Sequence, residues 1–107
     1  LIPKFQPVSH YPAISRDFNF ILDNQVHWAQ LEAATRSAAG ALLESVEYRE
    51  TFRDEQKDGA GKKRVLMSVV LRSQDSTLTG EQADEVCSRI VADCQSKLEG
   101  QLVGNLG

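Results

Sequence analysis

The sequence predicts an α+β fold in which one antiparallel sheet carries two helices on one face. The 107 residues are 41% hydrophobic and 25% charged, values that are ordinary for one small globular domain. Stretches with the two-residue period of a strand alternate with stretches of helical period. Glycine, asparagine or aspartate separates most of these stretches, as turns require.

The two ends of the chain differ from its middle. Residues 1–14 contain all three prolines and are expected to form an extended arm or a linker from an upstream domain. The domain itself is expected over 15–103, and 104–107 are expected to fray. Because the chain opens with Leu1 rather than Met, we expect it to be a piece of a longer protein.

The first strand is expected over 18–22 and the first helix over 25–39. Asn24 is the expected N-cap, Gly40 the expected stop, and Trp28 an expected core anchor. Alternation in the strand places three residues on one face: Phe18, Phe20 and Leu22. It places three others on the opposite face: Asp17, Asn19 and Ile21.

A hairpin with a polar loop at 54–62 is expected next, between strands at 43–53 and 64–72. Strict alternation in the first of these strands puts four residues on one face: Val46, Tyr48, Glu50 and Phe52. In the second, the apolar face comprises Val65, Met67, Val69 and Leu71. The other face comprises Arg64, Leu66, Ser68, Val70 and Arg72.

The last helix begins with a capping box, because Thr79 stands at the N-cap and Gln82 three residues later. Its expected end is about Glu99, before Gly100, and 101–103 form a possible last strand. Its apolar stripe comprises Ala83, Val86, Cys87, Ile90, Cys94 and Leu98.

The predicted order is therefore the split βαββαβ arrangement of ferredoxin-like folds. Right-handed crossovers place both helices on one sheet face and leave the other bare. A bare face with aromatic and basic residues can bind single-stranded RNA.

Catalytic and metal-binding motifs are poorly represented. Cys87 and Cys94 stand two helical turns apart, about 10 Å, which is too far for a disulfide, so free buried thiols in a reducing cytoplasm are expected. His10 and His27 are not spaced to join them in a metal site. The glycines at 59–61 lack the spacing of a phosphate loop, and no G-x-S-x-G sequence occurs. No run of about 18 apolar residues could span a membrane.

Charge is unevenly distributed, although the net charge is only −3. Residues 49–72 hold seven basic and four acidic side chains, whereas 75–99 hold two basic and six acidic ones. A local basic surface binds phosphates whatever the total charge. The alternative interpretation is a set of solvated strand ends beside a charged loop.

The second strand carries the best candidates for nucleic-acid binding. The ring of Phe52 can stack on a base, and the carboxylate of Glu50 can accept hydrogen bonds from guanine. They are expected to lie beside third-strand residues Arg64, Leu66 and Ser68. Alternation alone leaves open whether Tyr48 and Phe52 face the core instead.

Five short motifs occur in order along the chain. The first, at 11–18, is an aromatic residue, proline, three variable residues, Arg-Asp and an apolar residue. The others are Leu-Glu-Ser-Val-Glu at 43–47, Gly-Lys-Lys at 61–63, Leu-Arg-Ser at 71–73 and Thr-Leu-Thr-Gly-Glu at 77–81. With these motifs the chain resembles, from about Tyr11 to Val103, the ferredoxin-fold anticodon-binding domain that ends bacterial phenylalanyl-tRNA synthetase beta subunits.

The resemblance implies a non-catalytic domain that binds the anticodon stem-loop of tRNA(Phe). The implied parent is a cytoplasmic ligase of two alpha and two beta subunits, which charges tRNA(Phe) using ATP and Mg²⁺ in its alpha subunit. The implied partners are that RNA, the alpha subunit and the rest of the beta subunit, without DNA or a membrane, and no cofactor is implied for this domain. The alternatives are a regulatory or protein-interaction domain of the same fold and a small acylphosphatase-type hydrolase, whose anion loop is missing.

The resemblance also implies site residues. In the family an acidic residue, and an aromatic residue two positions further, contact anticodon bases, and these positions match Glu50 and Phe52. This chain departs from the family in having Glu for Asp at 50, Arg49 for an aromatic residue and Arg64 for Ser or Asn. The complete candidate set is Arg49, Glu50, Phe52, Lys62, Arg64 and Ser68. A further expectation is that Arg16 and Asp17 form a charge pair that ties the arm to the first strand.

Overall fold

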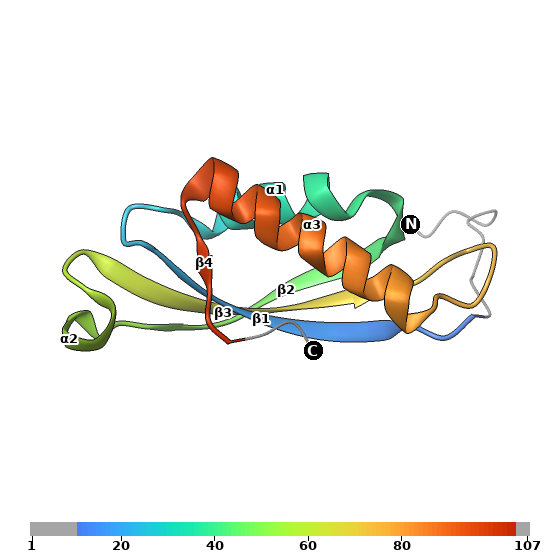
Figure 1. Cartoon of the computed structure of the whole chain (residues 1–107), viewed down its shortest axis with the longest axis horizontal. Coiled ribbons are helices and arrows are strands. Elements are labelled where there is room, and N and C mark those ends of the chain that lie inside the picture. Colours follow the sequence, from blue (N-terminus) through green and yellow to red (C-terminus); the bar gives the residue numbers. More distant parts are fainter. Residues whose placement is uncertain (1–10, 105–107) are drawn as a thin grey trace, which may run out of the picture.

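A sheet of four strands carries two long helices on one face in the computed structural model, which describes residues 11–104 (Figure 1). The elements in chain order are β1 (Ile14–Asp23), α1 (Trp28–Ala39), the 3-10 turn η1 (Gly40–Leu42), β2 (Leu43–Phe52), α2 (Glu55–Asp58), β3 (Lys62–Leu71), α3 (Gly80–Leu98) and β4 (Gln101–Leu102). The predicted βαββαβ order is confirmed, with the single turn α2 added inside the hairpin loop. Most of the predicted arm and of the predicted frayed tail lies outside the described residues.

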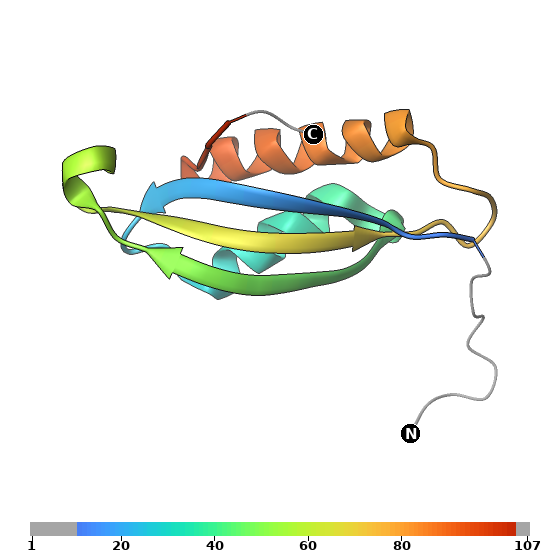
Figure 2. The same cartoon turned by 90° about the horizontal axis from the view of Figure 1, so that it is seen from below.

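The sheet has the strand order β2-β3-β1-β4, and every neighbouring pair is antiparallel. The central strands β1 and β3 pair from Ile14 opposite Leu71 to Asp23 opposite Lys62. Seen from below, the three long strands lie in front of α1 and α3, so the helices cover one face only (Figure 2). This is the ferredoxin-like arrangement that the sequence predicts.

The hydrophobic core lies between the helices and the covered face of the sheet. The strands contribute Phe18, Phe20, Leu22, Val65, Met67, Val69 and Leu71 to it. The helices contribute Leu31, Ala34, Ala83, Val86, Cys87, Ile90 and Cys94. The face assignments predicted for β1 and β3 are therefore confirmed. Burial of each large side chain contributes about 1.5–3 kcal/mol.

Helix α1 begins three residues later than predicted. The Asp23 carboxylate accepts a hydrogen bond from the Gln25 backbone N–H (2.8 Å), which makes a turn of the predicted first residues. His27 is the N-cap, and its backbone N–H donates to Gln30 Oε1 (2.8 Å). The prediction of Asn24 as the cap is wrong, because Asn24 belongs to this preceding turn.

Helix α3 has the predicted start and nearly the predicted end. Thr79 Oγ1 accepts from the Gln82 backbone N–H (3.1 Å), and Gln82 Oε1 accepts from that of Thr79 (2.9 Å). After the helix, Glu99 adopts the left-handed conformation with φ 54°. A Cβ on the next residue, Gly100, would lie 2.9 Å from Leu22 Cδ2, so the backbone closes tightly on the core here.

Two other expectations concern charge and membranes. Arg16 and Asp17 do not pair with each other, because successive strand residues point to opposite faces. Arg16 Nη2 lies 3.6 Å from Asp84 Oδ1 on α3, and Asp17 accepts a hydrogen bond from Ser68. No helix within residues 11–104 is both long and apolar enough to cross a membrane.

Candidate nucleic-acid interface

A bulge in strand β2 changes which of its alternate residues face the helices. The register of β2 against β3 shifts twice, and at the second shift, between Tyr48 and Glu50, Arg49 is the additional residue. Before the shift Val46 and Tyr48 pair with core-facing residues, whereas after it Glu50 and Phe52 pair with residues of the bare face. The predicted common face for these four residues is therefore wrong, because strict alternation assumes an unbroken ladder.

Because of the bulge, the two aromatic residues of β2, Tyr48 and Phe52, point to opposite faces of the sheet. Phe52 lies on the bare face opposite Arg64 and is 44% exposed. Tyr48 lies on the helix side at the sheet edge, 47% exposed, and meets Trp28 edge-on with ring centroids 5.5 Å apart. Trp28 packs against the core as predicted. Phe52 thus has a free ring on the face that the helices do not cover.

A hollow of about 310 Å³ opens on the bare face beside this ring. It is lined by Asn19, Phe52, Asp54, Lys57, Asp58 and Arg64. Its volume is at the lower end of the range for small-molecule sites, which suits one planar group. The Asn19 Oδ1 atom is buried and has no hydrogen-bond partner among the described residues. This oxygen is enclosed by the protein and is not exposed to a ligand in the hollow.

Arg64 and Asp58 form a forked ion pair in the wall of this hollow. Arg64 Nε and Nη2 donate to the two carboxylate oxygens at 2.8 and 2.7 Å. The Asp58 side chain is only 2% exposed. The hydrogen bond from Arg64 lowers the pKa of Asp58, and the same bond raises the pKa of Arg64. The guanidinium of Arg64, which the sequence predicts as an RNA contact, therefore already binds a carboxylate.

A chain of hydrogen bonds crosses the middle of the bare face. Arg49 Nε donates to Ser68 Oγ (2.9 Å), which donates to Asp17 Oδ1 (2.6 Å). Arg49 Nη2 also lies 3.2 Å from Glu47 Oε2. The predicted residues Arg49 and Ser68 are thus hydrogen-bonded to each other. Together the two hydrogen bonds link β2, β3 and β1 beside the bulge.

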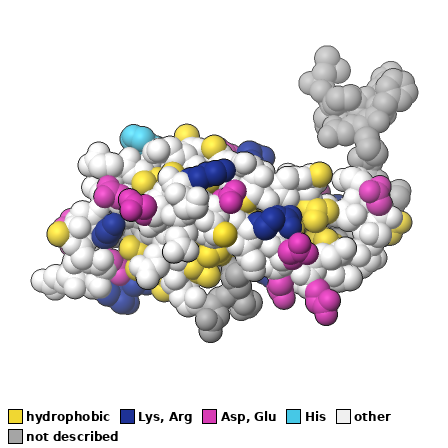
Figure 3. All heavy atoms as spheres, turned by 45° about the horizontal axis from the view of Figure 1, so that its top comes forward, with side chains coloured by type: hydrophobic (Ala, Val, Ile, Leu, Met, Phe, Trp, Pro, Cys, Tyr) yellow, Lys and Arg dark blue, Asp and Glu magenta, His cyan; other side chains and the backbone are white. Residues whose placement is uncertain are grey.

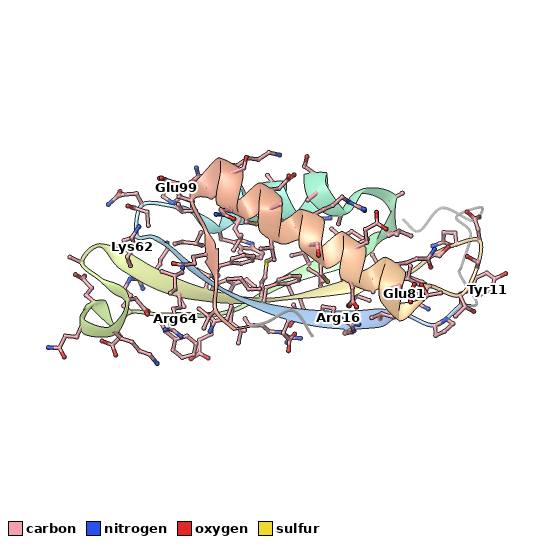
Figure 4. All side chains as sticks on the ribbon, in the orientation of Figure 1. Tyr11, Arg16, Lys62, Arg64, Glu81 and Glu99 are labelled. Atoms are coloured by element: carbon pink, nitrogen blue, oxygen red, sulfur yellow. The ribbon has the colours of Figure 1, made fainter. Side chains whose placement is uncertain are left out.

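The two adjacent lysines of β3 have different surroundings. Lys63 lies on the helix side, where its Nζ donates to the backbone carbonyls of Asn24 (3.2 Å) and Val26 (2.6 Å), and burial lowers its pKa. Lys62 begins β3 at the α2 end of the sheet, where Arg64 also lies (Figure 4). Within residues 11–104, neither Lys62 nor Glu50 forms an ion pair.

Charged groups of opposite sign are paired locally instead of being segregated. On the helix-covered side, acidic and basic side chains are interspersed (Figure 3). Three acidic residues of α3 pair with nearby cations, in Arg16–Asp84, Arg89–Glu85 and Lys97–Asp93. In the basic part, three arginines pair with carboxylates, in Arg49–Glu47, Arg64–Asp58 and Arg72–Glu44. The bare face therefore offers specific contacts more than a strong long-range positive field.

Four residues that line the hollow are not among the predicted site residues: Asn19, Asp54, Lys57 and Asp58. Asn19 was assigned to the correct face by alternation, but nothing in the sequence shows that its amide oxygen is buried and unsatisfied. Asp58 stood in a stretch expected to be loop, without a period that could reveal its partner. Its spacing of six residues from Arg64 matches neither a helical nor a strand repeat.

Comparison with known proteins identifies relatives for almost the whole chain. A family model described as "Ferredoxin-fold anticodon binding domain" matches residues 9–102. The phenylalanine–tRNA ligase beta subunit of Rhodopirellula baltica is 45% identical over 103 residues, which are 96% of this chain and 15% of that subunit. The subunit of the same name from Bifidobacterium longum is 42% identical over 88 residues (82% and 10%), and that from Aquifex aeolicus 33% over 90 residues (84% and 12%). The chain thus spans a small part of each relative.

Proposed function

Because this chain belongs to the ferredoxin-fold anticodon-binding domain family, we propose that it binds the anticodon stem-loop of tRNA(Phe) through the bare face of its sheet. In this proposal the chain is part of a phenylalanine–tRNA ligase beta subunit, as its relatives are. Such a ligase acts in the cytoplasm with ATP and Mg²⁺, its alpha subunit performs the chemistry, and this domain holds the RNA.

The observation that carries the proposal is the exposed ring of Phe52 beside the hollow. Stacking a base on an aromatic side chain contributes about 1–3 kcal/mol per base. Asn19, whose side chain is a polar amide, lines the same hollow together with the charged residues Asp54 and Lys57. A stacking surface with polar groups beside it is the combination by which proteins hold an unpaired nucleobase.

The other predicted residues have roles that follow from their contacts. Glu50 is exposed on the same face, with a carboxylate that can accept from the Watson–Crick edge of guanine. Lys62 supplies a cation for phosphate at this end of the sheet. Arg49 and Ser68 form the adjacent polar surface, where nucleotides on either side of the stacked base would lie.

A titration tests this function directly. The 107-residue chain is titrated with the tRNA(Phe) anticodon stem-loop and with the same RNA altered at the first anticodon base. We expect weak binding, a loss of affinity with the altered RNA, and a slope of log affinity against log salt of roughly −2 if about three phosphates are neutralised. Equal affinity for both RNAs would contradict base reading. A dimer without RNA affinity would favour a protein-interaction domain.

A further inference from the structure

We infer that Arg64 is a positioning residue, which fixes α2 as a wall of the base-binding hollow through Asp58 and does not itself bind phosphate. The inference rests on the proposed function and adds a device that determines the shape of the site. It also predicts that Asp58, although it is acidic and lies where RNA would bind, supports RNA binding.

Helix α2 needs an anchor to the rest of the domain. It has only four residues, and a helix of this length does not persist without tertiary support. Its cap is local, because Asp54 Oδ1 accepts from the Lys57 backbone N–H (3.3 Å), and Glu55 Oε2 accepts from that of Gly61 (3.2 Å). Among the hydrogen bonds of the described residues, the Arg64 fork to Asp58 joins this turn to the bare face of the sheet.

The charge of Arg64 is already compensated by a carboxylate. Two of its donors bind the two oxygens of a carboxylate that is 2% exposed, at distances typical of charge-assisted bonds. A phosphate that took over these two donors would leave the carboxylate buried without a partner. Lys57 lines the same hollow and forms no ion pair in the described part of the chain, so it is better placed as a phosphate ligand.

The Arg64–Asp58 pair lies next to the ring of Phe52. Asp58, Arg64 and Phe52 all line the hollow, and Arg64 is the direct cross-strand neighbour of Phe52. If the fork is lost, α2 is released and the hollow loses one side. The expected consequence is poorer recognition of the stacked base, with the cationic contacts at the rim unchanged.

Substitution of Asp58 changes RNA affinity in opposite directions under the two possibilities. If Arg64 positions α2, Arg64→Gln and Asp58→Asn both weaken RNA binding, and the double variant is no weaker than the poorer single variant. If Arg64 binds phosphate, Asp58→Asn frees its charge and strengthens binding, while Arg64→Gln weakens it. The variant Arg64→Lys distinguishes these two possibilities further, because lysine retains the positive charge but cannot form the forked pair with Asp58.

The experiment measures affinity, salt slope and base discrimination with the anticodon stem-loop and its variant altered at the first base. For Arg64→Lys we expect affinity to fall about tenfold, the ratio between the two RNAs to fall, and the salt slope to stay unchanged. Arg72→Lys is the matched control, since Arg72 forms a similar fork to Glu44 beyond the far end of β3 (2.9 and 3.5 Å). It should bind both RNAs as the unaltered chain does.

Stability and hydrogen-exchange measurements show whether a loss of RNA binding results merely from unfolding of the whole chain. Urea unfolding should show each variant to be folded, and amide hydrogen exchange should show faster exchange in α2 when the fork is lost. Tighter binding by Asp58→Asn, or full affinity in Arg64→Lys, would overturn this inference alone. No RNA binding by the unaltered chain would overturn the proposed function and this inference with it.

Discussion

The two faces of the sheet are built from the same strands by different rules. On the helix-covered face, Phe20 and Met67 are fully buried against the helices. On the bare face, charged and polar side chains bind one another between apolar ones, as in the Arg49–Ser68–Asp17 hydrogen bonds. The first face is stabilised by close packing, and the second keeps an exposed aromatic ring available to a ligand.

Folding and recognition therefore depend largely on different parts of this molecule. Strands β1 and β3 make the core with α1 and α3, and they alternate without interruption over ten paired positions. Strand β2 lies at the edge and carries the bulge that turns Phe52 away from the core. Substitutions on the covered face should therefore change stability, and those on the bare face should change binding.

The largest effect is expected from a cavity in the covered face. Phe20 is fully buried and stacks on Phe18 with ring centroids 5.8 Å apart. Phe20→Ala should lower the free energy of unfolding by about 3–5 kcal/mol, because it removes buried surface and leaves a void. Urea denaturation measures this loss. Val70→Ala on the bare face is the control and should cost less than about 1.5 kcal/mol; equal losses would contradict the division of the two faces.

A second prediction concerns the pH dependence of the covered face. Burial raises the pKa of Cys94 from its ordinary value of 9.0 to about 11. The folded state therefore holds this proton more tightly, so its contribution is complete below pH 9 and is lost as the pH rises toward 11. Two pKa units correspond to about 2–3 kcal/mol of unfolding free energy.

Urea denaturation between pH 8 and 11 measures this loss, with Cys94→Ala as the reference for every other group that titrates there. The unfolding free energy of the unaltered chain should fall more steeply with pH than that of the variant. Parallel curves would show that water reaches the thiol in the folded chain. Cys87 has a pKa that burial raises in the same direction and remains in both proteins.

The covered face was predictable from the sequence because packing there follows the strand and helix periods. The alternation of β1 and β3 and the stripe of α3 identified its residues correctly. The bare face was less predictable. The bulge at Arg49 is one additional residue, and its position depends on the register between β2 and β3, which alternation within β2 does not reveal. The fork between Arg64 and Asp58 depends on α2, a single turn inside the hairpin loop that shows no period in the sequence.

The sharpest comparison lies within β2, which presents two exposed aromatic residues to opposite sides. Phe52 and Tyr48 are similarly exposed, at 44% and 47%, and the bulge separates them. Phe52→Ala should weaken binding of the anticodon stem-loop by about 1–3 kcal/mol, because one stacked base is lost. Its effect on stability should be small, since the ring is not part of the core.

Tyr48→Ala is the matched control for this prediction. It removes the edge contact with Trp28, so a stability loss of about 0.5–1.5 kcal/mol is expected. Its affinity for the RNA should remain unchanged, because the ring lies on the helix side of the edge strand. RNA titration and urea denaturation of both variants therefore give a crossed pattern, binding lost in one and stability in the other. If Tyr48→Ala lost the RNA and Phe52→Ala kept it, the RNA would bind along the edge of β2, and the bare face would not be its site.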